Sequence, residues 1–293
     1  MKLLCFDIGG TNIKYGVIEN GIILEKSKFP TNYKIGHKDV TDRLIATAKK
    51  VQKKYPDIEG VGISCAGSIN FDEGRMITPP DAIQEFGEWD FEKLFMDELG
   101  LRIVADNDVN SFAACECKMG AGSKYKTYLV MTVGTGIGGA IVVNNKIWRG
   151  NNYNAGEIGR MLVDGVHWEK MASMTALIKS AKLRGLDIEE GKDVFDLYDQ
   201  GDKVAQLVVG EFYRNLGKGI ANLVYIFNPE AVIIGGAISA RDDFGFEINR
   251  YADYYLVEGF QSTLDIIPAH FKNDGGILGA YCNFVDRYGK EEN

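Results

Sequence analysis

The chain has 293 residues, 45% of them hydrophobic and 25% charged, which is enough for one large globular domain or for two lobes, the favoured arrangement. Its formal net charge is -8, and no lysine and arginine run or basic aromatic patch occurs, so nucleic acid is not expected as a partner. A membrane-length apolar run and a signal peptide are lacking, and five scattered cysteines fit reduced thiols, so we expect a cytoplasmic protein without membrane contact.

The predicted elements alternate between strands and helices in both halves of the chain. The first half is predicted to hold a strand ending at Asp7, two further strands, a helix over 38–55, a strand over 61–66, a helix over 90–99, a strand over 102–105 and a helix over 110–119. The second half is predicted to hold strands over 128–133, 140–143 and 146–148, helices over 168–183, 194–199 and 202–227, a strand over 231–234 and a helix over 275–288. This alternation predicts an α/β fold.

Two segments repeat one plan at an offset of 125 residues, 132 minus 7. The residues DIGGTNIKYGVIENGII, which begin at Asp7, align without a gap on TVGTGIGGAIVVNNKIW, which begin at Thr132. Each segment reads as a strand, a glycine-rich turn, a second strand, an asparagine-containing turn and a third strand. Chance similarity or convergent hairpins are the alternative, but the shared order favours a duplicated lobe.

The second glycine-rich turn contains Gly134-x-Gly136-x-x-Gly139, which is the spacing of a dinucleotide-binding fingerprint. That fingerprint needs a helix directly after the glycines, whereas the β-branched run from Ala140 to Val143 predicts a strand. A nicotinamide-dependent or flavin-dependent enzyme is therefore disfavoured. Because no lysine of the Walker A type follows the glycines, a P-loop NTPase is excluded as well.

Glycine-rich turns at strand ends, one in each half, suggest two backbone surfaces for one polyphosphate. Consecutive N–H groups in such turns can point at anionic oxygens, and small hydroxyl residues add donors without bulk. The candidate ATP-binding residues are Gly9, Gly10, Thr11 and Asn12 in the first turn, Gly134, Thr135, Gly136 and Gly138 in the second, and Gly235 and Gly236, which are expected beside the base or ribose. Asp7, just before the first turn, either orients hydrated Mg²⁺ or caps its own turn.

Further polar residues follow the predicted strand over 102–105 and precede a helix, where open α/β sheets place their sites. Asp106 or Asp108 could accept the proton of a hydroxyl group during phosphoryl transfer, or could cap the helix. Farther along, Glu157 and Arg160 could converge on a polyhydroxylated ligand, and Glu169 opens a helix. From their spacing alone, Glu157, Arg160 and Glu169 could equally well be ordinary surface residues.

Six segments together resemble the ROK family of sugar kinases, within the actin-like ATPase superfamily. They are Asp7-Ile-Gly-Gly-Thr11, Asp106-Asn-Asp-Val-Asn110, Val133-Gly-Thr-Gly-Ile-Gly-Gly139, Ala155-Gly-Glu-Ile-Gly159, Ile234-Gly-Gly236 and Gly276-Ile-Leu-Gly-Ala280. The resemblance implies a two-lobe actin-like ATPase (ribonuclease H-like) α/β fold with duplicated lobes, and a homodimer. We expect a lobe of residues 1–110 with a C-terminal helix of about 277–293, a lobe of residues 111–276, and an active site in the cleft between them.

The same resemblance implies a kinase that uses ATP and Mg²⁺ to phosphorylate a hexose hydroxyl, with O6 preferred. Asp108 matches the general base, Asn107 beside it binds sugar hydroxyls, Glu157 and Glu169 match sugar-binding acids, and Gly67 is expected at the sugar. The alternative is a catalytically weak sugar-sensing protein of the same fold. ROK repressors carry a preceding DNA-binding domain, for which a strand that begins by residue 3 leaves no room.

The sequence departs from the family pattern around residue 160. Arg160 stands where the family commonly has a histidine that binds zinc and a sugar hydroxyl, and the nine residues from Met161 to Glu169 contain no cysteine. We therefore expect no zinc site, and Arg160 can only donate hydrogen bonds, whereas a neutral histidine can also accept them. The short interval suggests a larger acceptor than glucose, such as a β-glucoside or an N-acylated hexosamine. Asp106 replaces the usual glutamate, a change that is not expected to alter the chemistry.

Overall fold

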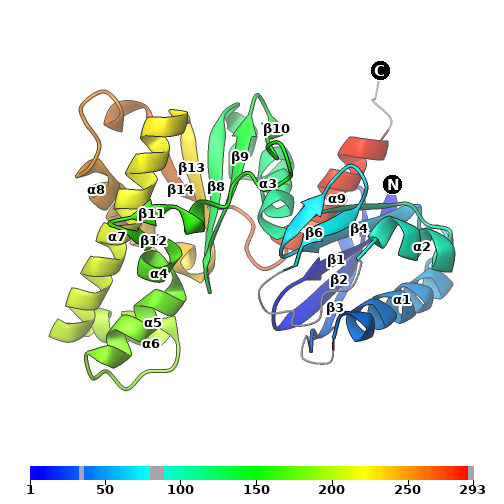
Figure 1. The fold of residues 1–293 in the computed structure, drawn as a ribbon, viewed down its shortest axis with the longest axis horizontal. Coiled ribbons are helices and arrows are strands. Elements are labelled where there is room, and N and C mark those ends of the chain that lie inside the picture. Colours follow the sequence, from blue (N-terminus) through cyan, green and yellow to red (C-terminus); the bar gives the residue numbers. More distant parts are fainter. Residues whose placement is uncertain (33–35, 80–88, 290–293) are drawn as a thin grey trace. The chain divides into compact units, whose positions relative to one another are not determined.

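The computed structural model describes residues 1–32, 36–79 and 89–289, which form two compact units (Figure 1). Unit 1 comprises Met1–Gly120, Arg149–Ala155 and the segment that starts at Asn273, and unit 2 comprises Ala121–Trp148 and Gly156–Lys272. The predicted boundary after residue 110 stays a prediction. Residues 290–293 of the predicted C-terminal segment lie outside the described part of the chain.

The sheet of unit 1 has five strands, and three neighbouring strands on one side of it run parallel to one another. Its order is β3 (Ile22–Pro30), β2 (Asn12–Glu19), β1 (Lys2–Ile8), β4 (Gly60–Cys65) and β7 (Ile103–Asn107). The antiparallel strands β2 and β3 follow β1 as a meander, whereas β4 and β7 pair with their neighbours in parallel. Since parallel strands end at the same edge, the pairing places Asp7, Ser64 and Asp106 in one row across the sheet.

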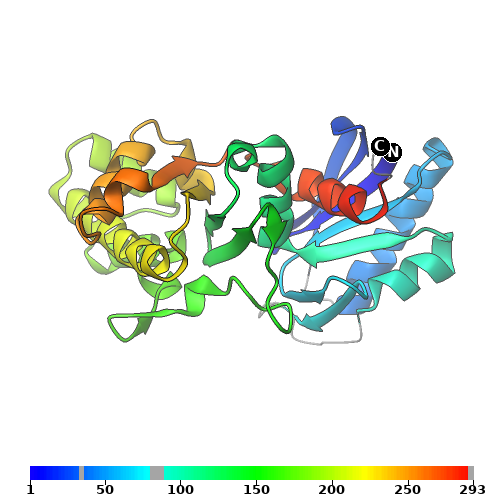
Figure 2. The same cartoon turned by 90° about the horizontal axis from the view of Figure 1, so that it is seen from above.

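Alternation along β1 gives the two faces of this sheet different partners. Leu4, Phe6 and Ile8 join one hydrophobic core with residues of α1 (His37–Lys54) and α2 (Phe91–Leu99). The other face lies against α9 (Gly275–Tyr288), as Figure 2 shows, and α9 also packs on α3 (Asp108–Met119). Asp7 points to the α9 face, where Gly276 lies directly against its carboxylate.

Unit 2 repeats the topology of unit 1, which confirms the predicted duplication. Its sheet has the order β10 (Lys146–Ile147), β9 (Ile137–Val143), β8 (Tyr128–Val133), β13 (Ala231–Gly235) and β14 (Asp265–Pro268). As in unit 1, the first three strands form an antiparallel meander, and the last two join in parallel. Each unit is thus a strand–hairpin–helix lobe with the same strand order.

The register of the hairpins corrects the gap-free alignment of the two segments by one residue. In unit 1, Ile8 pairs with Ile13, which leaves four residues in the turn, whereas in unit 2 Val133 pairs with Ile137 and leaves three. The offset of 125 therefore holds on the first strand and becomes 124 on the second. The later two-residue turns are then equivalent, Asn20–Gly21 with Asn144–Asn145, and all four residues have positive φ.

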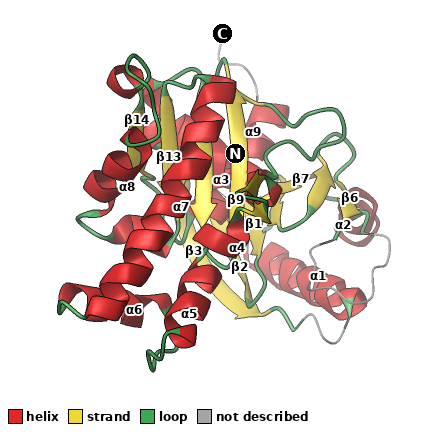
Figure 3. Cartoon of the chain, turned by 60° about the vertical axis from the view of Figure 1, so that its left-hand side comes forward, coloured by secondary structure: helices red, strands yellow, loops and turns green. Residues whose placement is uncertain are grey.

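Helices of unit 2 lie beside its sheet, with α7 and α8 running along β13 and β14 (Figure 3). Their bounds are α4 (Glu169–Ala172), α5 (Met174–Leu183), α6 (Gly191–Asp199), α7 (Lys203–Phe227) and α8 (Phe244–Asp253). The single helix predicted over 168–183 is wrong, because Ser173 is extended and its side chain caps a new helix at Ala176 N–H. Short hairpins complete the chain, namely β5 (Ser68–Asn70) with β6 (Arg75–Thr78), and β11 (Leu162–Val163) with β12 (Val166–His167).

Candidate functional site

Asp7 lies near the end of β1 in a polar setting that matches a phosphate and metal site. Its Oδ1 accepts a hydrogen bond of 3.1 Å from the Ser64 hydroxyl, and its Oδ2 lies 3.4 Å from the Lys14 ammonium. A Cβ at Gly276 would collide with this carboxylate, so a larger residue there would displace Asp7 from its present position. One half-buried carboxylate is a donor set that suits Mg²⁺, which keeps most of its waters and takes further oxygens from substrate phosphates.

The first glycine-rich turn is braced from one side. The Gly9 N–H donates to the Asn12 carbonyl at 3.2 Å, and the Gly9 and Thr11 carbonyls accept from the Thr31 hydroxyl and N–H at 2.6 and 2.9 Å. Gly10 and Thr11 are exposed, and a Cβ at Gly10 would have no neighbour within 4 Å. The buried Thr31 thus fixes the turn while its outer surface stays open to a ligand.

The second glycine-rich turn brings a predicted phosphate site and a predicted sugar-binding acid together. Gly134 donates to the Gly136 carbonyl at 3.0 Å, and the Gly134 carbonyl accepts from Met174 N–H at 2.9 Å. A Cβ at Gly136 would lie 2.7 Å from the Glu169 carboxylate, and one at Gly159 would lie 3.3 Å from the same oxygen. Thr135 is exposed at the tip of this turn.

Gly236 places the third glycine turn beside the second. Its φ is 106°, a conformation that favours glycine, and an added Cβ would collide with the Val133 carbonyl. Val133 is the last residue of β8 before Gly134, and Gly235 ends the neighbouring strand β13. In unit 2, therefore, the candidate nucleotide residues of two turns are neighbours.

Asn107 caps helix α3, so the two aspartates considered as caps do not fill that role. Its Oδ1 accepts from the N–H groups of Val109 and Asn110 at 2.8 and 3.1 Å, and its Nδ2 donates to the Gly67 carbonyl at 3.0 Å. Asp108 is the first residue of α3, where the helix dipole stabilises a carboxylate. The cap thereby fixes Asp108 at the same sheet edge as Asp7. Burial raises the pKa of the Cys65 thiol, and the negative charges of Asp108 and Asp7 add to that rise.

Asp106 is enclosed, which separates its role from that of Asp108. It is 1% exposed, and its two oxygens accept five hydrogen bonds from the Asn107 N–H, Asn110 Nδ2, Asn283 Nδ2 and two nitrogens of Arg149. Burial raises the pKa of the Asp106 carboxyl, and the Arg149 guanidinium opposes that rise. A carboxylate with this many internal donors has no oxygen left for a substrate proton, so Asp108 is the candidate base.

Glu157 and Arg160 form an exposed ion pair on a short helical turn of unit 2, with Glu157 Oε2 and Arg160 Nε 3.5 Å apart. After Arg160 the chain forms the β11–β12 hairpin, whose turn residues Asp164 and Gly165 both have positive φ. His167 Nδ1 donates to the Arg160 carbonyl at 2.7 Å. The short interval is thus a minimal hairpin that leads directly to Glu169.

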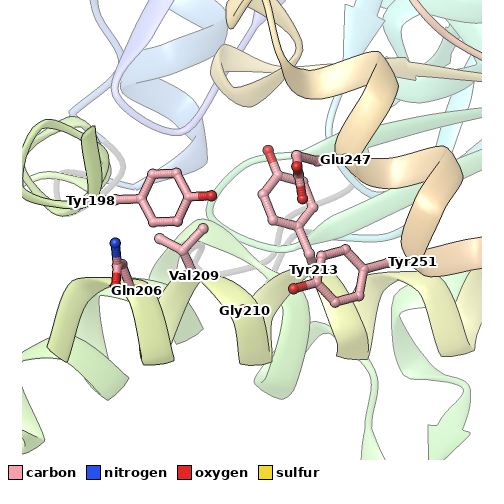
Figure 4. Close-up of a pocket in the computed structure, with 7 residues that line it drawn as sticks. All are labelled: Tyr198, Gln206, Val209, Gly210, Tyr213, Glu247 and Tyr251. Carbon is pink, nitrogen blue, oxygen red and sulfur yellow. The ribbon is translucent and has the colours of Figure 1, made fainter. Parts of the chain in front are cut away.

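A separate cavity of about 210 Å³ lies between α6, α7 and α8 of unit 2 (Figure 4). It is lined by Tyr198, Gln206, Val209, Gly210, Tyr213, Glu247 and Tyr251. Figure 4 shows the Tyr198 ring pointing from α6 toward Tyr213. The Tyr213 hydroxyl is buried and has no hydrogen-bond partner among the described residues. None of the predicted site residues lines this cavity.

Within residues 1–32, 36–79 and 89–289, every helix is too short or too polar to span a lipid bilayer. Nor do those ranges hold a group of three or more histidine, cysteine, aspartate or glutamate side chains that could bind a metal ion.

Several residues at these sites were not predicted from the sequence, because only the folded chain brings them to the residues that they contact. Lys14 and Ser64 contact Asp7, and Thr31 braces the first turn. Arg149 pairs with Asp106 over a separation of 43 residues. Only the Gly276 segment had a sequence signal, as one of the six segments that resemble the ROK family.

The chain is similar to known proteins over almost its whole length. The model of the ROK family matches residues 3–286. The beta-glucoside kinase of Listeria monocytogenes is 33% identical over 305 residues, covering 100% of both chains. A ROK family glucokinase from Streptomyces griseus, solved with glucose and AMPPNP, superposes with a TM-score of 0.82 at 28% identity, covering 96% of this chain and 98% of that one. A candidate N-acetylmannosamine kinase from Listeria monocytogenes gives 0.85 at 30% identity, covering 98% and 99%.

The fold is therefore the two-lobe α/β fold of the actin-like ATPases, and each unit described above is one lobe of it. The chain belongs to the ROK family, among its ATP-dependent sugar kinases.

Proposed function

We propose that this protein transfers the γ-phosphate of Mg·ATP to O6 of a glucose-type sugar, with β-glucosides as the first candidates. The observation that carries the proposal is the position of Asp108. This carboxylate opens helix α3 at the strand edge that also holds Asp7, and the Asn107 cap fixes it there. In phosphoryl transfer the protein compensates the negative charge of the phosphate groups and supplies a positioned carboxylate that accepts the proton of the attacking hydroxyl group.

Each unit supplies part of the proposed machinery. In unit 1, Gly9, Gly10, Thr11 and Asn12 bind phosphate oxygens and Asp7 holds Mg²⁺ through water, while Gly67, Asn107 and Asp108 receive the sugar. In unit 2, Thr135, Gly136, Gly235 and Gly236 bind the nucleotide, and Glu157, Arg160 and Glu169 bind sugar hydroxyls. Bound Mg²⁺ would supply positive charge to the phosphate oxygens. Lys14 stands beside Asp7 and can donate to the same phosphate oxygens.

The acceptor class rests on the relatives and on the hairpin after Arg160. The beta-glucoside kinases of Listeria monocytogenes and Klebsiella pneumoniae are 33% identical over almost the whole chain, and the glucokinase of Streptomyces coelicolor is 33% identical over 307 residues. The β11–β12 hairpin is as short as a two-residue turn allows, which leaves room for a substituent on the acceptor sugar. We expect cellobiose and other β-glucosides to exceed free glucose in kcat/KM.

A coupled ADP-release assay over glucose, mannose, fructose, allose, N-acetylmannosamine, N-acetylglucosamine and cellobiose tests the proposal. A 6-deoxy analogue of the best acceptor should bind competitively without turnover, because it lacks the reacting hydroxyl. Turnover of the 6-deoxy sugar would overturn O6 as the acceptor. Sugar binding without ADP release for every acceptor would favour the sugar-sensing alternative.

We further propose that the protein acts in the cytoplasm, which its scattered cysteines fit, and that it is a homodimer, as its resemblance to the family implies. Sedimentation equilibrium on the purified full chain tests the assembly state, since a monomeric mass at micromolar concentration would contradict it.

A further inference from the structure

Residues Arg149–Ala155, here called the 149–155 loop, pack in unit 1 although the chain before and after them belongs to unit 2. Three side chains hold the loop in place. Arg149 pairs with Asp106, the Tyr153 hydroxyl donates to Asp72 Oδ2 at 2.6 Å, and Asn154 bonds with the Ser68 hydroxyl. Tyr153 also has a φ of 61°, a conformation that costs free energy for a bulky residue. The loop therefore has a defined structure that its side-chain contacts enforce.

The Asp106–Arg149 ion pair is the most buried of these anchors. Arg149 Nη2 and Nε lie 2.7 and 3.2 Å from Asp106 Oδ2, and the exposed fractions of the two side chains are 18% and 1%. The guanidinium also stacks on the Phe71 ring, 3.6 Å from its centroid. Planar stacking combined with two parallel N–H donors is a geometry that arginine provides and lysine cannot.

Both ends of the loop are linked, each through an intervening residue, to the turn that carries the candidate base. The Asp106 carboxylate that binds Arg149 also accepts from the Asn107 N–H at 2.9 Å. At the far end, Asn154 bonds with Ser68, the residue after Gly67, and the Gly67 carbonyl accepts from Asn107 Nδ2 at 3.0 Å. Two independent chains of hydrogen bonds thus connect the loop to Asn107, directly before Asp108.

We propose that the 149–155 loop is a specificity-determining part of the sugar site, held against the Asn107–Asp108 turn by Arg149 and presenting Asn154 to the acceptor. The inference rests on the proposed function. Asn154 is half-buried, and its Nδ2 donates to the Asn152 carbonyl at 3.2 Å, which leaves its second amide hydrogen for a ligand oxygen. Its neighbours Gly67 and Asn107 are both expected at the sugar, so the ligand group recognised is a ring hydroxyl or an acyl oxygen of the sugar.

The test compares Arg149→Met and Asn154→Ala with the wild-type full chain in steady-state kinetics. Both variants should raise the sugar KM on the order of 10-fold or more, because misplaced acceptor contacts lose binding and alignment, and should leave the ATP KM unchanged. Arg149→Lys should recover only part of the loss, since lysine cannot reproduce the two-pronged geometry.

Arg287→Met is the matched control. Arg287 donates to the Phe71 and Asp72 carbonyls at 2.6 and 2.5 Å and lies 5.6 Å from the centroid of the Phe71 ring, so it supports the same segment without contacting Asp106. Its replacement should leave the sugar KM within twofold of wild type. An equal rise in the sugar KM of this variant would show that general support of the segment is responsible.

A double variant, Asp106→Asn with Arg149→Met, separates positioning from stability. It removes the unpaired buried charge, so thermal stability should recover relative to Arg149→Met while the sugar KM stays raised. A return of the sugar KM to the wild-type value, or an unchanged KM in both Arg149→Met and Asn154→Ala, would overturn the inference. If Arg149→Met does not fold, Asn154→Ala and the double variant decide.

The wild type separates failure of this inference from failure of the proposed function. Turnover by the wild type with unaltered variants refutes only the loop proposal. Absence of turnover with every acceptor refutes the kinase proposal, and the same comparison is then made with sugar dissociation constants from calorimetry, for which the expected ratios are identical.

Discussion

Three aspartates at one sheet edge of unit 1 lie in different surroundings, and these surroundings are the basis of the different role that we propose for each. Asp7 is half-buried beside Lys14 and Ser64. Asp106 is enclosed and fully hydrogen-bonded, whereas Asp108 stands at a helix N-terminus next to the cap. Environment, more than residue type, thus distinguishes the proposed metal-binding carboxylate of Asp7, the proposed positioning carboxylate of Asp106 and the proposed base, Asp108.

Replacement of Asp108 by asparagine tests the assignment of the base. Asp108→Asn should lower kcat by about 10²-fold or more, which is the lower end of general-base contributions, and should leave both KM values near wild type. The measurement is steady-state ADP release together with thermal unfolding, because an unchanged melting temperature shows that α3 is intact. Turnover close to wild type in a folded variant would remove Asp108 from the role.

The buried ion pair predicts a dependence of stability on pH in Arg149→Met. Removing one partner of a buried pair costs about 3 to 5 kcal/mol. Burial already raises the Asp106 pKa, and losing the arginine removes the group that opposes this rise. A carboxyl whose folded pKa exceeds its unfolded value binds more protons when folded, so stability falls as the pH rises above the unfolded value of about 3.9.

Urea unfolding of Arg149→Met and wild type at pH 5 and pH 8 measures this effect. The loss in unfolding free energy should be larger at pH 8, where the unpaired carboxylate is charged. The double variant with Asp106→Asn serves as control and should show an equal loss at both values. An equal loss for Arg149→Met would mean that Asp106 finds another compensating group.

At the scale of elements, the sequence predicted those helices and strands that depend mainly on the residues within them. Helix α9 was predicted over the residues that it occupies, as a helix that a glycine, Gly275, opens. The strand after Gly136 was also predicted correctly, and it ruled out the dinucleotide-binding fingerprint. The one-residue difference between the hairpin turns was missed, because backbone pairing of this kind has no distinct sequence pattern. The break at Ser173 was also missed, although a serine whose side chain caps a helix is a recognisable start signal.

Long-range contacts at the site were beyond sequence reasoning for a related reason. Lys14 contacts Asp7 because the antiparallel register of β1 and β2 pairs these two residues. Arg149 meets Asp106 because a loop flanked by unit 2 packs in unit 1. Both contacts are determined by tertiary packing, and not by the secondary-structure propensity of the residues involved. The kinds of residue at the candidate site were nevertheless predictable. Glycine-rich turns can bind phosphate oxygens through their N–H groups, and polar residues at strand ends lie where α/β sheets place their sites.

The turn between β8 and β9 gives a prediction for an element. An alanine at Gly136 would press on the Glu169 carboxylate, which is the flexible end of a side chain and can move away. We therefore expect Gly136→Ala to keep the melting temperature within a few degrees and to raise the sugar KM, as Glu169→Gln should. A rise in the ATP KM alone would instead show that the Gly136 backbone matters chiefly to the nucleotide.

At the scale of the whole molecule, the duplicated topology gives each unit a core of its own. In unit 1, Gly279 on α9 lies against the backbone of Ser111 on α3, and in unit 2, Gly219 on α7 lies against the Trp168 indole. A Cβ would overlap its neighbour at both positions, although alanine is the better helix former. Overpacking of this kind costs about 1 to 3 kcal/mol.

Gly279→Ala and Gly219→Ala therefore form a reciprocal pair that tests whether the two cores are energetically separate. Hydrogen exchange followed by mass spectrometry on the full chain reads the opening of each unit in one experiment. Gly279→Ala should speed exchange in peptides of residues 36–79 and 89–120, and Gly219→Ala in peptides of residues 156–272. Because α3 carries Asp108 at its start, only Gly279→Ala should also lower kcat. Faster exchange across both units in either variant would mean that the lobes unfold as one cooperative body.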